Sequence, residues 1–153
     1  MRKPVALSVA GSDSSAGAGI QADLRMFSAL GAYGTTAITA LTAQNPEQVT
    51  HVVGMDAEFV RAQIDAVFES LPVRAIKTGM LWSAEVIEAV AESIGQHADV
   101  PCVVDPVMIA TSGAKLVADE AIETYKNKLL PRAALITPNI DEAQVLLGGE
   151  PIG

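Results

Sequence analysis

The fold of this chain is decided by AGSDSSAGAGIQAD, residues 10–23. An apolar run over residues 5–9 precedes this stretch and predicts a strand, and apolar residues at helical spacing follow it and predict a helix that ends near Gly31. Open α/β sheets bind ligands where a strand gives way to a helix, because unpaired N–H groups and the helix dipole face the crevice there. The stretch therefore predicts a flexible loop at a ligand site, although Gly/Ser/Ala-rich turns also occur as plain connectors.

Short apolar runs alternate with longer periodic ones along the rest of the chain. Strands are predicted over 34–41, 49–53, 75–77, 102–104 and 134–136, with 49–53 as an edge or flap piece. Helices are predicted over 60–71, from the Ser83 cap to Ile94, from Asp119 to about Leu129 before Pro131, and from Asn139 to Leu147. This alternation predicts a single α/β domain over residues 1–153, with a mostly parallel sheet and right-handed crossovers.

Composition and charge narrow the class of protein. Of the 153 residues, 50% are hydrophobic but only 4% are aromatic, so Ala, Val, Ile and Leu must build a core of strands covered by helices on both faces. The net charge of −8 argues against nucleic-acid binding, which needs a basic face. A small anionic ligand remains compatible, since local N–H groups or a metal ion can offset the overall sign.

The cysteine, the histidines and the N-terminus give no catalytic signal. Cys102 lies within an apolar run and is expected to be a buried structural thiol. His51 and His97 stand alone in polar surroundings and are expected to be surface residues. We read no signal peptide and no apolar stretch long enough to cross a bilayer, so a cytoplasmic protein is expected.

Polar residues follow nearly every predicted strand. They are Asp13, Asp23, Gln44, Asn45, Lys77, Asp105, Asn139 and Glu142. The carboxyl ends of parallel strands share one edge of a sheet, so these side chains are expected to converge. Taken singly, Asp23 could be a solvated helix residue, Met80 could pack in the core, and Asn139 with Glu142 could form only a capping box.

The motifs as a set resemble a known family. They are AGSD at 10–13, GAGIQAD at 17–23, FSALGAYG at 27–34, ITALTAQN at 38–45, KTGML at 77–81, VDPVM at 104–108, and LITPN at 135–139 with Glu142. On these motifs the chain is identified as similar to the hydroxymethylpyrimidine/phosphomethylpyrimidine kinases of thiamine biosynthesis, in the ribokinase-like superfamily. The resemblance implies a three-layer αβα fold with a mostly parallel central sheet.

The resemblance also implies a reaction and a site. ATP would phosphorylate 4-amino-5-hydroxymethyl-2-methylpyrimidine and then its monophosphate. Gln44 would hydrogen-bond the pyrimidine, since an amide both donates and accepts. The resemblance assigns further residues to the pyrimidine (Gly11, Asp23, Met80 and Val107), to the nucleotide and its phosphates (Asp105, Asn139 and Glu142), and to Mg²⁺ (Asp105 and Glu142).

The same resemblance places the catalytic residues outside this sequence. In the family, the glycine-rich anion hole, the group that activates the hydroxyl and much of the adenine pocket come from a later segment. The chain is therefore expected to be an incomplete, C-terminally truncated domain with little or no kinase activity of its own, and an uncovered sheet edge is expected to favour a homo-oligomer, most simply a dimer. Three other readings stay open: a pyridoxal kinase of the same lineage, a pyrimidine-binding module without catalysis, and a structural partner that completes its sheet with another chain.

Overall fold

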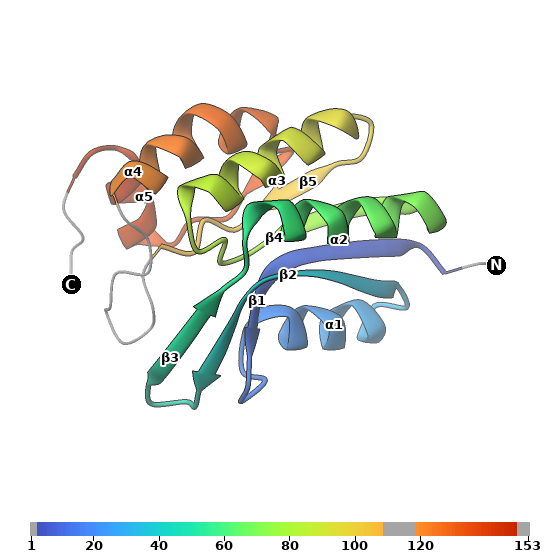
Figure 1. The fold of residues 1–153 in the computed structure, drawn as a ribbon, viewed down its shortest axis with the longest axis horizontal. Coiled ribbons are helices and arrows are strands. Elements are labelled where there is room, and N and C mark those ends of the chain that lie inside the picture. Colours follow the sequence, from blue (N-terminus) through green and yellow to red (C-terminus); the bar gives the residue numbers. More distant parts are fainter. Residues whose placement is uncertain (1–2, 109–118, 150–153) are drawn as a thin grey trace.

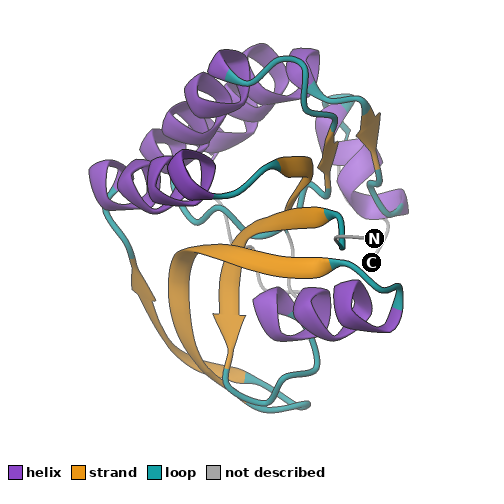
Figure 2. Ribbon diagram, turned by 90° about the vertical axis from the view of Figure 1, so that its right-hand side faces the viewer, coloured by secondary structure: helices purple, strands orange, loops and turns teal. Residues whose placement is uncertain are grey.

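A six-stranded sheet forms the middle layer of the molecule, with helices on both faces (Figure 1, Figure 2). The structure is a computed structural model that describes residues 3–108 and 119–149. The strands are β1 (Val5–Asp13), β2 (Tyr33–Gln44), β3 (Val49–Gly54), β4 (Val73–Thr78), β5 (Cys102–Val104) and β6 (Leu135–Ile136), in the spatial order β3-β2-β1-β4-β5-β6. All neighbours pair in parallel except β2 and β3, which are antiparallel. The expected three-layer, mostly parallel architecture is confirmed.

Helix α1 (Gly19–Ala29) covers one face of the sheet, and α2 (Ala57–Ser70) and α3 (Ala84–Gln96) cover the other (Figure 1). Side chains alternate across β1, so Val5, Leu7 and Val9 enter the main core while Ser8 faces α1. The Asp56 and Ser83 side chains cap α2 and α3 by accepting from the main-chain N–H groups three residues on. The sequence located both helices because their apolar spacing is regular, although α2 begins three residues earlier and α3 ends two residues later than predicted.

The first strand is longer than the sequence suggested. Ending it at residue 9 was wrong, because Ala10, Ser12 and Asp13 continue the parallel pairing with β2 across an irregularity at Gly11. Small side chains do not prevent pairing when a neighbouring strand supplies the partners, and tertiary contacts decide here over composition. The connecting loop is therefore residues 14–18, and β2 likewise runs to Gln44 instead of ending at 41.

The helical region after residue 118 also differs from the expectation. Helix α4 (Asp119–Thr124) continues into a π-helical turn, η1 (Tyr125–Leu129), and a 3₁₀ turn, η2 (Leu130–Arg132). Pro131 was expected to close the helix, but it sits inside η2 near its start, where a missing N–H costs little. The last helix, α5 (Ile140–Leu146), begins as predicted at the Asn139 cap.

Two features of the surface bear on assembly and on membrane association. Leu135 and Ile136 of β6, at the edge of the sheet, are 56% and 43% exposed, and Leu147 beyond α5 is 88% exposed. Among residues 3–108 and 119–149, no helix is both long enough and apolar enough to cross a membrane.

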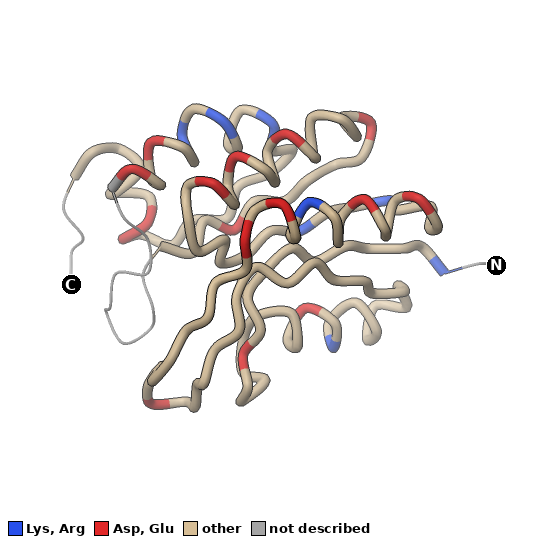
Figure 3. The backbone as a smooth tube through the Cα atoms, in the orientation of Figure 1, with Lys and Arg blue, Asp and Glu red and all other residues tan. Residues whose placement is uncertain are grey.

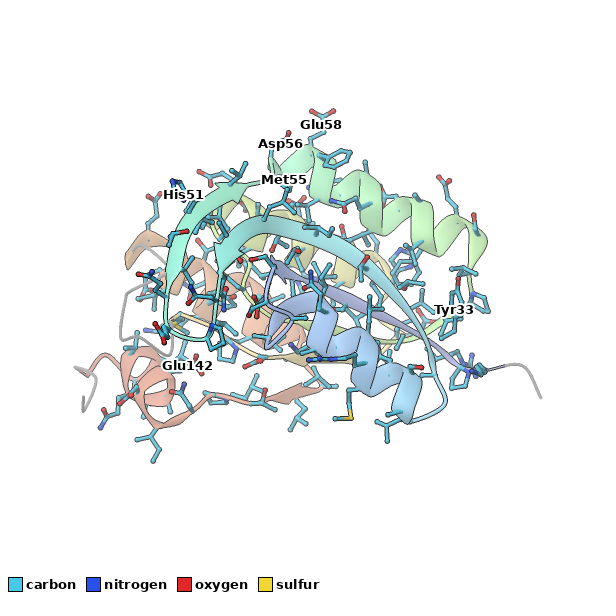
Figure 4. All side chains as sticks on the ribbon, turned by 90° about the horizontal axis from the view of Figure 1, so that it is seen from below. Tyr33, His51, Met55, Asp56, Glu58 and Glu142 are labelled. Atoms are coloured by element: carbon cyan, nitrogen blue, oxygen red, sulfur yellow. The ribbon has the colours of Figure 1, made fainter. Side chains whose placement is uncertain are left out.

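Cys102 and the two histidines can now be placed. Burial raises the pKa of the Cys102 thiol to about 12, as expected for a structural cysteine. His51 is exposed on β3, at the opposite end of the hairpin strands from Tyr33 (Figure 4). His97 corrects the expectation of polar surroundings, because its ring stacks on Phe68 with the two ring centroids 3.6 Å apart.

Candidate functional site

A cavity of about 300 Å³ opens at the carboxyl ends of β1, β2, β4 and β5. It is lined by all five residues that the resemblance assigned to the pyrimidine, namely Gly11, Asp23, Gln44, Met80 and Val107. Asp105 lines the same cavity, together with Val49 and Val52 of the β3 edge strand. The expected convergence of side chains at the strand ends is confirmed in part: Asp13, Asp23, Gln44, Lys77 and Asp105 line the cavity, whereas Asn45, Asn139 and Glu142 do not.

Gly11 and Met80 form a close contact between two neighbouring segments of the cavity wall. A Cβ atom at position 11 would lie 2.7 Å from Met80 Cε, so a side chain there would displace the end of Met80 from its place against the β1 backbone. Thr39 Oγ1 donates to Met80 O across 2.5 Å and holds the main chain of the turn after β4. Met80 is only partly buried and lines the cavity, so packing in the core does not describe it.

Asp23 is held by two polar partners and is not a solvated helix residue. Ser8 Oγ donates to Asp23 Oδ2 at 2.6 Å, and Lys77 Nζ lies 3.1 Å from Asp23 Oδ1. Lys77 Nζ also lies 3.6 Å from Asp105 Oδ2. The three charged side chains are between 15% and 32% exposed, so water screens them only in part. A single ammonium group therefore joins the carboxylate of α1 to the carboxylate that follows β5.

Two carboxyl groups near the ends of β5 and β6 are shifted toward their neutral forms. Burial raises the pKa of Asp105, and the neighbouring Lys77 ammonium opposes that shift without cancelling it. Burial likewise raises the pKa of Glu142, against hydrogen bonds from the Asn139 and Met108 main chain. The charge of Asp105 raises the pKa of Glu142 further, so the two carboxyl groups lie close enough to repel one another when both are ionised.

The loop after β1 corrects one physical expectation. Its N–H groups were expected to be free for a ligand, but Asp13 Oδ1 accepts from Ser15 N at 2.8 Å and Asp13 Oδ2 accepts from Ala18 N at 2.8 Å. Ala16 N donates to Asp13 O at 3.0 Å. Burial raises the pKa of Asp13, but hydrogen bonds to its carboxylate from the Ser15 hydroxyl and from main-chain N–H groups of the loop outweigh burial, so the pKa is lowered. The Asp13 carboxylate therefore occupies N–H groups of this loop that an anionic ligand could otherwise have bound.

Gln44 lies at the last position of β2, where main chain and side chain are both held. Ser14 Oγ donates to Gln44 O and accepts from Gln44 N, each at 2.8 Å. The Gln44 side-chain amide lies 3.2 Å from Thr42 Oγ1. These contacts link the loop after β1 to the end of β2 and fix the amide at the cavity wall.

Asn139 and Glu142 lie apart from the cavity lining. Asn139 Oδ1 accepts from Glu142 N at 2.8 Å, and Glu142 Oε2 accepts from Asn139 N at 2.9 Å. The two residues thus form the capping box that the sequence allowed, at the start of α5, where Figure 4 labels Glu142. Within the described ranges, no three His, Cys, Asp or Glu side chains gather closely enough to form a metal site on their own.

Three polar residues of the site were not assigned to it from the sequence. Lys77 was noted at a strand end and Thr42 only within the motif at 38–45, both without a role, and Ser8 was not singled out. A period-two reading of the strands would have found them, because Ser8 and Thr42 interrupt apolar stretches at positions that face α1 and the cavity. Figure 3 shows basic residues scattered singly or in small groups among more numerous acidic ones.

Residues 13–153 match the phosphomethylpyrimidine kinase family. The hydroxymethylpyrimidine/phosphomethylpyrimidine kinase of Bacillus subtilis (strain 168) is 52% identical over 143 residues, which cover 94% of this chain and 53% of that protein. A crystal structure of phosphomethylpyrimidine kinase from Clostridium difficile 630 superposes with a TM-score of 0.89 at 48% identity, over 97% of this chain and 64% of that one.

A pyridoxal kinase is a more distant neighbour. The enzyme from Staphylococcus aureus in complex with AMP-PCP and pyridoxal has a TM-score of 0.82 at 35% identity, covering all of this chain and 55% of that one. The chain spans about half the length of the curated relatives it matches. Because the family match extends over nearly the whole sequence, this chain belongs to the phosphomethylpyrimidine kinase family.

Proposed function

We propose that this chain forms the pyrimidine-binding part of a kinase that transfers phosphate from ATP to 4-amino-5-hydroxymethyl-2-methylpyrimidine and then to its monophosphate. The observation that carries the proposal is the cavity at the strand ends, which gathers Gly11, Asp23, Gln44, Met80 and Val107. Its size suits a single substituted ring, and its walls combine apolar contact with a few polar groups. The family relationship supports the reaction class.

The polar groups of the cavity suit an aminopyrimidine. Gln44 offers an amide that can pair with a ring edge, and Met80 and Val107 offer apolar contact to ring faces. We assign Gly11 to the close approach of the ring to the β1 backbone, since a side chain there would meet Met80. Asp23 is positioned by Ser8 and Lys77 to accept a hydrogen bond from the substrate.

We assign Asp105, Asn139 and Glu142 to the nucleotide side of the site. Mg²⁺ is held in proteins by one or two carboxylates together with phosphate oxygens and water, so the Asp105 and Glu142 carboxylates are a fitting pair of donors. The repulsion that Asp105 exerts on Glu142 also favours a cation nearby. When bound, Mg²⁺ would neutralise phosphate charge. The role of this chain's own residues is to hold the pyrimidine ring and its hydroxymethyl group in one orientation.

Phosphoryl transfer tests the proposal directly. A protein carrying this chain together with the further half that the relatives possess should phosphorylate the hydroxymethylpyrimidine with ATP and Mg²⁺, and Gln44→Leu should raise the KM for the pyrimidine about tenfold or more. Phosphorylation of pyridoxal in preference to the pyrimidine would support the pyridoxal kinase alternative. Binding of the pyrimidine without any transfer would support a binding module.

We also propose that the chain works in the cytoplasm and associates with a second copy of itself. The exposed Leu135 and Ile136 on the β6 edge and the exposed Leu147 support association, because apolar edge strands tend to pair. Sedimentation velocity should show a dimer that Ile136→Lys shifts toward the monomer. Leu30, directly after α1, is 76% exposed and provides a matched control. Leu30→Lys should leave the proportions of monomer and dimer unchanged.

A further inference from the structure

The main chain at Gln44 is fixed before any ligand binds. Ser14 Oγ lies 2.8 Å from both Gln44 O and Gln44 N, so its one hydrogen goes to the carbonyl while its lone pair receives the N–H. The end of β2 is thereby tied to the loop after β1. The main-chain position of Gln44 is therefore fixed. What remains to be determined is the orientation of its side-chain amide, that is, whether the oxygen or the nitrogen faces each neighbouring group.

The hydroxyl group of Thr42 determines the orientation of the Gln44 amide. Thr42 Oγ1 lies 2.9 Å from Ser12 O and 3.2 Å from the Gln44 amide atom placed as Oε1. Both of those atoms would accept a hydrogen bond, but a hydroxyl carries one hydrogen. The shorter contact, to a main-chain carbonyl of the neighbouring strand, takes that hydrogen. A lone pair on the Thr42 oxygen is then left facing the amide.

Exchanging the two amide atoms of Gln44 satisfies every one of these groups without moving any of them. Oxygen and nitrogen of a side-chain amide have nearly the same shape, and their hydrogen-bond partners determine the orientation. With Nε2 donating to Thr42 Oγ1, and Thr42 donating to Ser12 O, the pairs form an unbroken chain. Gln44 lines the cavity, so its carbonyl oxygen, which in this orientation no longer faces Thr42, is the acceptor left for a ligand.

We propose that Thr42 is a positioning residue that turns the Gln44 carbonyl oxygen toward the cavity and so selects a ring bearing an amino group over one bearing an oxo group at the same position. The inference rests on the proposed function and adds the chemical basis of its specificity. An amino group donates to the oxygen, whereas an oxo group would set one acceptor against another. A fixed amide discriminates between the two, but an amide free to turn adapts to either.

Calorimetric titration of this chain tests the inference with two probes, 4-amino-5-hydroxymethyl-2-methylpyrimidine and its 4-oxo counterpart. The unmodified chain should bind the amino compound about tenfold to a hundredfold more tightly, the range expected when a site's polar group loses its partner. Thr42→Val removes the hydroxyl at constant shape and should reduce the preference to about threefold or less, since the amide can then turn. Thr42→Ser keeps the hydroxyl and should restore the preference.

Thr50→Val is the matched control. Thr50 Oγ1 donates to Ala43 O at 3.0 Å on the same hairpin, and Thr50 does not line the cavity, so its loss should leave the ratio of the two affinities unchanged. Equal binding of both probes by the unmodified chain, or a Thr42→Val variant that keeps the full preference, would overturn the inference and leave the proposed function standing. Binding of neither probe would contradict the pyrimidine site itself and the inference with it.

Discussion

Lys77 Nζ lies 3.1 Å from Asp23 Oδ1, although the two residues are 54 positions apart in the chain. Lys77 extends from β4 and Asp23 from α1, so the ion pair joins the sheet to α1. This helix covers the face of the sheet opposite to the one covered by α2 and α3. Asp105 approaches the same ammonium group from the end of β5. The relationship makes one lysine the counter-ion of two carboxylates at the cavity.

Replacing Lys77 with Met should destabilise the chain. Both Asp23 and Asp105 would lose their counter-ion while keeping much of their burial, at a cost of about 1–2 kcal/mol, less than for a fully buried pair because water reaches all three side chains. Urea unfolding at neutral pH measures the change. Lys126→Met breaks the more exposed pair with Glu123 and should cost under about 0.5 kcal/mol. Equal effects of the two variants would contradict the account.

The pH dependence of stability should change when Asp105 becomes Asn. Burial, opposed by Lys77, leaves the pKa of Asp105 raised in the folded protein. A raised pKa means that its contribution to stability is fully present below the unfolded pKa and is lost as pH rises through the folded value. Asp105→Asn cannot ionise, so relative to the unmodified chain it should gain stability as pH rises from about 3 to about 7.

Thermal unfolding of both proteins across that pH range measures the effect of Asp105→Asn. The difference in Tm should grow with pH and then level off above the folded pKa. A difference that shrinks with rising pH would show that the ion pair with Lys77 outweighs the burial of Asp105, contrary to the raised pKa of this carboxyl group.

Asp13→Asn should lower stability at neutral pH. Asp13 accepts from the N–H groups of Ser15 and Ala18, and an amide would set its NH₂ against one of these donors, at a cost of about 2 kcal/mol. Because the pKa of Asp13 is lowered, this stability is present above the unfolded pKa and is lost as pH falls through the folded value. The gap between the two proteins should therefore close in acid.

Asp56→Asn provides the control for Asp13→Asn. Asp56 accepts from Phe59 N at 2.7 Å as the cap of α2, and Asn caps a helix about as well as Asp does. Guanidinium unfolding should find the Asp56 variant close to the unmodified chain. An Asp13 variant that is equally stable would show that the loop after β1 does not depend on its internal carboxylate.

Gly19→Ala, at the first residue of α1, should be among the most destabilising single changes near the loop after β1. Gly19 has φ +59°, and a Cβ atom there would overlap Gly11 O and lie 3.1 Å from Asp13 N. The left-handed backbone alone costs about 1–2 kcal/mol for a residue with a Cβ atom, and the overlap with β1 adds to it. Gly31 has φ +78° with open space around it, so Gly31→Ala should show the backbone cost alone. Equal losses of unfolding free energy for the two variants, measured by urea unfolding, would show that the added Cβ at position 19 does not clash with Gly11.

The order of strands and helices could be predicted well where the signals in the sequence are local. Apolar residues at helical spacing located α2 and α3, and the Asn139 and Ser83 caps marked helix starts that the structure confirms. The C-terminal extents of β1 and β2 were too short, because Ala10 to Asp13 pair only through a neighbouring strand that local composition cannot reveal. The identity of the strand that pairs with a given segment depends on the tertiary structure and cannot be read from the residues of that segment.

Several residues that line the cavity were named from the sequence, but the contacts that hold them were not, and Asn139 and Glu142 lie outside its lining. Convergence of strand ends brought Gln44 and Asp105 to one cavity, as the topology requires. The ion pairs of Lys77 and the hydroxyl contacts of Thr42 could not be foreseen, because they depend on side-chain directions across three strands and a helix. The free N–H groups expected in the first loop were also wrong, since Asp13 folds back onto them.

Amide chemical-shift mapping by NMR tests the central claim most directly. On titration of the isolated chain with 4-amino-5-hydroxymethyl-2-methylpyrimidine, the largest shifts should fall on Gly11, Asp23, Gln44, Met80 and Val107, and Gln44→Leu should weaken them together. Shifts confined to the α2–α3 face, or none at saturating concentration, would contradict a pyrimidine site at the strand ends.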